Sequence, residues 1–138
     1  MLKIKLNLLH IKRTISIKGG ASNVVKIANL SKFANNVALN QLKLADVNPD
    51  DTTSLINVSN AMIDSQNDFI SKVEKSLIEV FHLSKKDVER VMDETSVPDL
   101  MAFVNYVYGR MNGATDEDFD QAPKDQPRSK NSIDQTLS

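Results

Sequence analysis

The chain has 138 residues and a net charge of −1, with 41% apolar residues, 5% aromatic residues and no Trp. This length predicts one domain with a modest core, which has to be built mainly from Val, Leu, Ile, Ala and Met. The absence of cysteine excludes disulfide bonds and thiolate zinc sites, and no run approaches the roughly 20 apolar residues of a membrane-spanning helix, so we expect a cytoplasmic protein without a membrane anchor.

Charge is divided unevenly along the chain. Residues 1–45 contain eight basic side chains and no acidic one, whereas residues 46–120 contain sixteen acidic side chains against six basic ones. This division is consistent with a partner of defined charge or with self-association of unlike ends. It is equally consistent with two solvated faces that differ in charge.

The N-terminus has the pattern of a β-hairpin. Residues 2–6 alternate between apolar and polar side chains, and the alternation resumes over residues 11–18, beginning with Ile11. The phase changes in between, which places a turn near Asn7–His10, although Leu8-Leu9 is poor turn sequence. An isolated hairpin is marginal in water, so we expect a helix or a neighbouring subunit to cover its apolar side.

A helix is predicted after Gly19-Gly20, which ends the second strand. Ser22 is the expected N-cap, and the helix runs to about Leu44. Its apolar residues follow helical spacing: Val24, Ile27, Ala28, Leu30, Ala34, Val37, Ala38 and Leu42. Four asparagines lower its intrinsic propensity, so we expect it to depend on tertiary packing.

The next helix has the clearest periodicity in the chain. Asn48–Asp51 supplies a turn and a cap, and residues 54–82 follow without Gly or Pro. The apolar positions at helical steps include Leu55, Val58, Met62, Phe69, Val73 and Leu77. A helix of this length far exceeds the mean of about 11–12 residues. It is either the spine of a small bundle or a surface that binds a partner.

Two capping signals divide the remainder of the helical region. Ser84–Asp87 resembles a capping box and opens a short helix that ends near Asp93. Ser96–Asp99 opens another, in which Pro98 lies in the first turn and needs no N–H donor. Gly113 is the expected left-handed C-cap of this last helix.

These elements predict a mainly α fold of the α+β class, with a small N-terminal β-hairpin and a compact bundle of about four helices. Residues 1–113 form a single domain, with the hairpin at 1–18 and the helical body at 19–113. Residues 114–138 contain few apolar side chains and two prolines among polar residues. This composition predicts a disordered, acidic and polar tail.

The sequence contains no constellation that predicts catalysis, a cofactor or a metal. It has neither GxxxxGK[ST] nor GxGxxG. His10 and His82 are far apart and lack cysteine partners, so turns or solvent explain them better than a metal site. Acidic pairs such as Asp50-Asp51 lie at helix ends, where capping and the helix dipole explain them. We expect no enzyme activity.

Two charged segments have alternative interpretations. The lysines of the first 26 residues could contact phosphates, but they alternate with the apolar face of a strand, and nucleic acid is not the expected partner. The acidic segment Asp116–Asp120 surrounds Phe119 with four carboxylates. It could dock into a basic, apolar groove or simply begin a solubilising tail.

The order of four stretches resembles the tail assembly chaperones of long-tailed, siphovirus-type bacteriophages of Gram-positive bacteria. The stretches are LKIKLN, VFHLSKKDV, PDLMAFVNYVYGRMNG and ATDEDF. The resemblance covers roughly residues 1–120 in layout and 55–120 in detail. Leu8-Leu9 departs from it, since family members tend to have a tighter turn with glycine.

The resemblance implies a non-enzymatic protein without a cofactor. Such proteins bind the tape measure protein, keep it soluble until tail tube subunits polymerise around it, act in the host cytoplasm and are absent from the mature virion. Coating a long chain requires several copies, so unlike charged ends could meet head to tail in a homo-oligomer. The alternatives are a small phage protein that binds nucleic acid through its basic N-terminal region and an unrelated helical protein-interaction module.

A chaperone of this kind needs an exposed, adaptable apolar surface. We expect the long helix, the last helix and the acidic segment to supply it. The predicted partner-binding residues are Phe69, Val73, Leu77, Phe81, Phe103, Val107, Met111 and Phe119.

Overall fold

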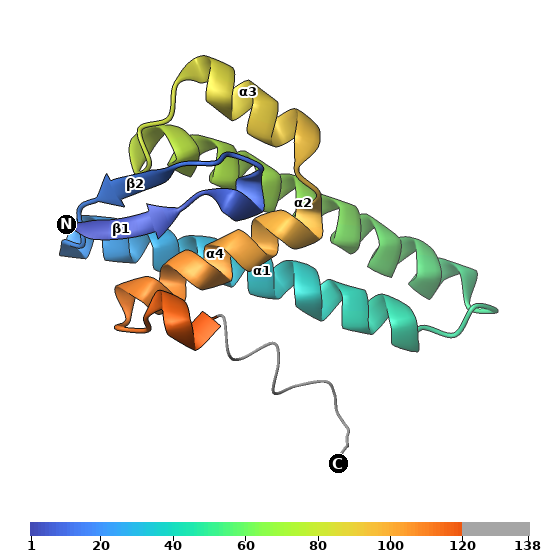
Figure 1. Cartoon of the computed structure of the whole chain (residues 1–138). Helices are drawn as coiled ribbons and strands as arrows, with labels where there is room; N and C mark the ends of the chain where they lie inside the picture. The colour runs from blue at the N-terminus through green and yellow to red at the C-terminus, as the bar shows by residue number, and fades with distance from the viewer. Residues whose placement is uncertain (120–138) are drawn as a thin grey trace, which may run out of the picture. The chain divides into compact units, whose positions relative to one another are not determined.

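The computed structural model describes residues 1–119 and is mainly helical (Figure 1). Its strands and helices are β1 (Leu2–Lys5), β2 (Thr14–Ile17), α1 (Ala21–Asp46), α2 (Thr52–Glu79), α3 (Lys85–Glu94) and α4 (Val97–Met111). The predicted helical fold with an N-terminal antiparallel hairpin is confirmed. Most of the predicted disordered tail, residues 120–138, lies outside the described residues.

The hairpin turns where the sequence predicts, but its second strand begins later. Asn7–Leu9 forms a 3-10 turn, and His10 follows in the left-handed conformation with a φ of 63°. The prediction that β2 begins at Ile11 is wrong, because Ile11 still belongs to the turn: its N–H donates to the Leu6 carbonyl at 3.3 Å, and its carbonyl accepts the N–H of Arg13 at 2.9 Å. Pairing resumes at Thr14, which lies opposite Lys5.

Of the predicted caps at the starts of α1 and α2, the first is wrong and the second is confirmed. Ser22 is not the N-cap of α1, since Gly20 holds that position in an extended conformation and its carbonyl accepts the N–H of Val24 at 3.1 Å. Asp51 caps α2 as predicted. Its carboxylate accepts the N–H of Ser54 at 3.1 Å and the Ser54 hydroxyl at 2.8 Å.

The predicted caps at the starts of α3 and α4 are also confirmed. The Ser84 hydroxyl oxygen accepts the N–H of Asp87 at 3.1 Å and begins α3. The Ser96 hydroxyl oxygen accepts the N–H of Asp99 at 3.3 Å and begins α4. In both cases the side chain satisfies a backbone donor that the first helical turn leaves unpaired.

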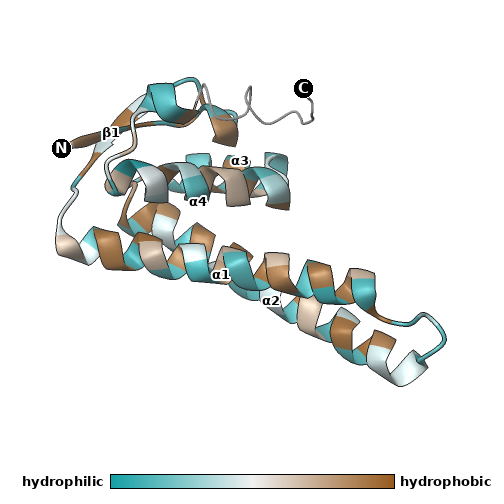
Figure 2. Ribbon diagram, turned by 90° about the horizontal axis from the view of Figure 1, so that it is seen from below, coloured by the Kyte–Doolittle hydropathy of each residue, from teal (hydrophilic) through white to brown (hydrophobic). Residues whose placement is uncertain are grey.

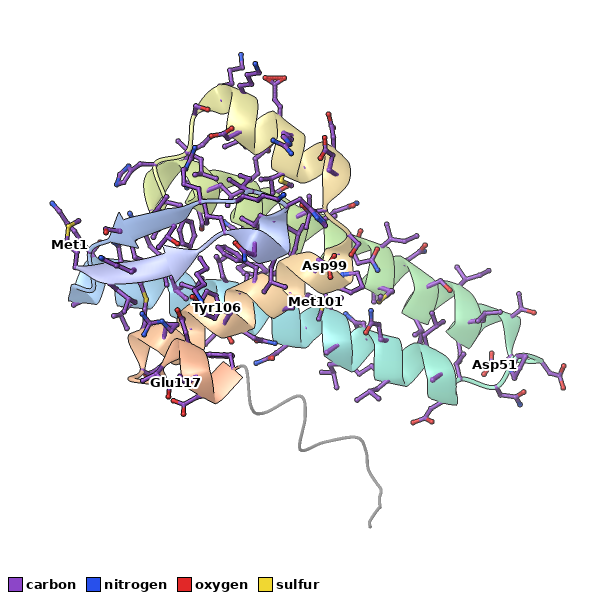
Figure 3. The ribbon with its side chains drawn as sticks, in the orientation of Figure 1. Met1, Asp51, Asp99, Met101, Tyr106 and Glu117 are labelled. Atoms are coloured by element: carbon purple, nitrogen blue, oxygen red, sulfur yellow. The ribbon has the colours of Figure 1, made fainter. Side chains whose placement is uncertain are left out.

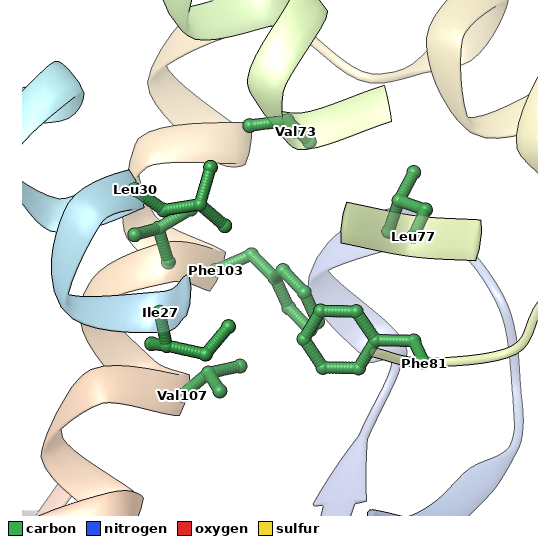
Figure 4. Close-up of a pocket in the computed structure, with 8 residues that line it drawn as sticks. Ile27, Leu30, Val73, Leu77, Phe81, Phe103 and Val107 are labelled. Atoms are coloured by element: carbon green, nitrogen blue, oxygen red, sulfur yellow. The ribbon is translucent and has the colours of Figure 1, made fainter. Parts of the chain in front are cut away.

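The core of residues 1–108 lies where α4 crosses α1 and α2. Figure 4 shows Ile27 and Leu30 of α1 with Val73 and Leu77 of α2, facing Phe103 and Val107 of α4. Phe81 completes this cluster, with its ring centre 5.3 Å from that of Phe103 at an interplanar angle of 55°. The cluster leaves no room for a water molecule.

The chain divides into two compact units, residues 1–108 and the residues from Gly109 onward. In the second unit, Gly113 has a φ of 99° and ends α4. Its N–H donates to the Arg110 carbonyl at 3.2 Å, and the Ala114 N–H donates to the Gly109 carbonyl at 3.0 Å. These are the two bonds of a Schellman motif, so the predicted left-handed C-cap is confirmed.

Candidate functional site

The predicted partner-binding residues fall into two groups. Six lie in the core of the first unit, each at most 4% exposed: Phe69, Val73, Leu77, Phe81, Phe103 and Val107. Met111 and Phe119 are half-buried. The apolar stripes of α2 and α4 therefore join these helices to the rest of the fold. A partner would reach the six buried side chains only by opening the core.

A different apolar surface lies on the distal half of the α1–α2 hairpin. From Ala38 to Gln66 no residue is buried, whereas the remaining parts of both helices contain buried residues. Figure 2 shows this stretch continuing beyond α3 and α4 as a two-helix projection with apolar positions along it. We call residues 38–66 the arm, and the remaining parts of the two helices, residues 21–37 of α1 and 67–79 of α2, the base.

The arm exposes large apolar side chains. Four of them are at least half exposed: Leu39 (50%), Leu42 (66%), Ile56 (53%) and Ile63 (54%). Two further residues, Leu55 and Met62, are half-buried and precede the fully buried Phe69 at heptad spacing. Residues at this spacing share one helix face. The face of α2 that packs into the core therefore continues along the arm without the cover it has at the base.

The arm is also acidic. Residues 38–66 contain Lys43 against Asp46, Asp50, Asp51 and Asp64, a net charge of −3. Figure 3 shows Asp51 at the far end of the arm. The pKa of its carboxyl is lowered, first because the backbone N–H of Ser54 donates to it and second because the Ser54 hydroxyl does so. The arm thus offers apolar side chains beside negative charge.

A lysine-lined groove lies between the bases of α1 and α2. It has a volume of about 260 Å³ and includes Lys26, Lys72 and Lys75. The Glu79 carboxylate lies 3.8 Å from Lys26 Nζ and 3.9 Å from Lys75 Nζ. Lys72 Nζ lies 5.7 Å from the centre of the Phe33 ring. All three ammonium groups are therefore engaged within the protein.

The two histidines occupy turns. His10 Nε2 lies 3.9 Å from a carboxylate oxygen of Asp99, and His82, three residues after the end of α2, has a φ of 53°. Among residues 1–119, no three His, Asp or Glu side chains are grouped so that they could hold a metal ion. No helix of this described part is long and apolar enough to cross a membrane.

The acidic segment after α4 contributes to local structure in the second unit. Thr115 and Asp118 cap each other, because the Thr115 N–H donates to Asp118 Oδ2 at 2.7 Å and the Asp118 N–H donates to Thr115 Oγ1 at 3.3 Å. Arg110 Nε lies 3.1 Å from Asp116 Oδ1. Two of the four carboxylates of the predicted docking motif, those of Asp116 and Asp118, therefore contact partners within the second unit.

The aromatic residue of this segment packs against a glycine that sequence reasoning missed. A Cβ on Gly109 would lie 2.5 Å from the tip of the Phe119 ring, so only glycine permits this approach. The sequence signal that could have indicated this close contact is a glycine inside an otherwise helical pattern. Asp120, the last residue of the predicted motif, lies outside the described residues.

The chain matches a model of a known protein family. A family model described as "Phage tail assembly chaperone proteins, TAC" matches residues 2–126, which is most of the chain and includes the whole arm. No curated protein matches the chain, and no solved structure does.

Proposed function

The chain belongs to the phage tail assembly chaperone family, and from this premise we propose that it binds the tape measure protein, keeps it soluble and helps to recruit tail tube subunits. Family membership favours a non-enzymatic role in tail assembly, which takes place in the host cytoplasm. The long-tailed type of phage, the Gram-positive host and the absence of the protein from the mature virion remain predictions from the sequence resemblance.

One structural observation supports this function above the others, namely the exposed apolar surface of the arm. Leu39, Leu42, Ile56 and Ile63 are held in water on one projection. Exposed apolar patches of soluble proteins commonly mark interaction sites. A protein that keeps a long, partly apolar helical chain in solution needs a surface of this kind.

The methionines support an adaptable surface. Met62 on the arm, Met92 on α3, and Met101 and Met111 on α4 are all half-buried. Their unbranched, polarisable side chains adjust to irregular neighbours more readily than Ile or Val. Half-buried methionine can therefore contribute to the fold and still accommodate a partner whose apolar positions vary along its length.

Co-expression tests the proposed function. The partner is the very long, helix-rich protein whose gene we expect directly downstream, and the measurement is the fraction of that partner that stays in the supernatant. We expect it to be soluble with this chain and to precipitate with an unrelated acidic helical protein of similar size. If the partner is equally insoluble with and without this chain, the chaperone role fails.

We also propose that several copies act together on one partner chain. The basic region of residues 1–45 and the acidic region that follows carry opposite charge, so unlike ends of neighbouring copies could meet head to tail. Assembly size measured by light scattering should fall as ionic strength rises, because salt screens exposed charges. A monomer at every salt concentration contradicts self-association.

A further inference from the structure

We propose that the arm, residues 38–66, is the docking surface for a basic amphipathic helix. This inference rests on the proposed chaperone function and adds to it the surface used and the chemistry of the segment recognised. It replaces the buried positions on α2 and α4 with side chains that a partner can reach without unfolding the base.

The shape of the site points to a helix. At the base, α4 packs across α1 and α2, and its residue Phe103 meets Ile27 and Val73 (Figure 4). Figures 1 and 3 show that α4 begins at the root of the arm and runs away from it. Beyond that point the same face of α2 continues through Met62 and Leu55. A second helix laid along the arm would repeat the packing that α4 makes at the base.

The chemistry of the site points to a basic helix with an apolar stripe. Leu42, Ile56 and Ile63 supply exposed apolar contacts, which an amphipathic helix reads at i, i+3 and i+4. The net charge of −3 on the arm favours lysine and arginine on the flanks of that stripe and disfavours an acidic helix. The arm shares this negative charge with the rest of residues 46–120, where sixteen acidic side chains outnumber six basic ones.

A second copy of this chain fits the arm less well than a separate partner. The helices α2, α3 and α4 each contain at least as many acidic as basic residues. The basic side chains of the N-terminal region lie mostly on the hairpin and its connections, such as Lys3, Lys12 and Lys18. The helix α1 has a basic excess, with three lysines against Asp46, but its apolar residues Ile27, Leu30 and Val37 are buried in the core. A second copy would therefore present the apolar face of α1 to an arm only by opening its own core.

The absence of cysteine allows a clean test, because any cysteine introduced is the only one in the 138-residue chain. Ile63→Cys places an environment-sensitive fluorophore on the arm, and Ser71→Cys places it on the exposed side of α2 at the base. The probe is a synthetic helical peptide of about 20 residues with a leucine stripe and lysine at the other positions. The control peptide carries glutamate in place of lysine.

We expect a saturable signal from the label at 63 and none from the label at 71. The lysine peptide should bind at least about tenfold more tightly than the glutamate peptide. The double variant Leu42→Ser/Ile56→Ser, with unchanged circular dichroism, should weaken lysine-peptide binding by about tenfold or more. Equal binding of both peptides, or unchanged binding by the double variant, overturns the proposal.

Two further outcomes separate this inference from the chaperone role. If the label at 63 responds to unlabelled chain without peptide, the arm is an interface between copies and the proposal is wrong. If the double variant still keeps the tape measure protein soluble on co-expression, the arm is not the docking surface although the chaperone role stands. If the wild-type chain fails to keep that partner soluble, the chaperone role fails independently of peptide binding.

Discussion

The backbone N–H of Lys5 donates a hydrogen bond to the hydroxyl oxygen of Tyr106, 3.2 Å away. The two residues are 101 positions apart, so this bond fastens β1 to α4. Tyr106 is buried, and its ring centre lies 6.5 Å from that of Phe103. The same side chain therefore supports the core with its ring and orders the hairpin with its hydroxyl.

Replacing Tyr106 by Phe should separate these two contributions. The ring and its packing remain, but the acceptor for the Lys5 N–H is removed. We expect a loss of about 1 kcal/mol in the free energy of unfolding, the usual net contribution of one hydrogen bond, measured by urea denaturation. Tyr106→Leu, which also removes the ring, should cost more. Equal stability of Tyr106→Phe and wild type would show that the bond contributes nothing.

Truncations in the core and in the arm should have very different effects on stability. Phe103→Ala removes a buried aromatic side chain from the core and should cost about 3–5 kcal/mol. Ile63→Ala removes an exposed side chain and should change the free energy of unfolding by less than about 0.5 kcal/mol. Urea denaturation checks both values. A large loss for Ile63→Ala would mean that the arm is part of the core.

The cap at the far end of the arm should depend on pH. Because the folded-state pKa of Asp51 is lowered, its stabilising effect is fully present above the ordinary pKa of Asp and is lost as pH falls through the lowered folded value. Carboxyl NMR titration should place Asp51 below the usual range, and the exchange of the Ser54 amide should speed up in acid. Asp51→Ala should remove this pH dependence. An ordinary pKa for Asp51 contradicts the cap.

The turn after α2 should discriminate between side chains at position 82. His82 has a φ of 53°, a region that Asn tolerates and β-branched residues avoid. We expect His82→Asn to be close to wild type and His82→Val to be less stable than His82→Asn by about 1–2 kcal/mol. Thermal and urea denaturation measure the difference. If the two variants are equally stable, the turn relaxes at no cost.

Local signals in the sequence predict the helix boundaries well. Asp51, Ser84 and Gly113 act where they stand because capping depends on a few neighbouring residues. Ser22 is not the cap because α1 begins earlier, at Ala21, with the Gly20 carbonyl accepting the N–H of Val24, so Ser22 already lies inside the first helical turn. The predicted start of β2 was wrong because the 3-10 turn and the left-handed His10 keep Ile11 in the connection, where its N–H donates to the Leu6 carbonyl.

The position of the exposed surface could not be predicted from periodicity. Leu55, Met62 and Phe69 follow one heptad pattern, and nothing in the sequence distinguishes them. Only Phe69 is buried, because the other elements cover the base of α2 and leave the arm bare. The spacing of apolar residues predicts which face of a helix is apolar. Whether that face is exposed depends on where another helix covers it.

Hydrogen–deuterium exchange of the chain, alone and in its co-expressed complex with the tape measure protein, tests most directly whether the arm is the chaperone surface. Bound side chains suppress local opening of the helices that carry them, so we predict slower exchange across residues 38–66 in the complex. Residues 69–79 at the base should exchange as they do in the free chain. Protection confined to the base, with the arm unchanged, would contradict binding through the arm.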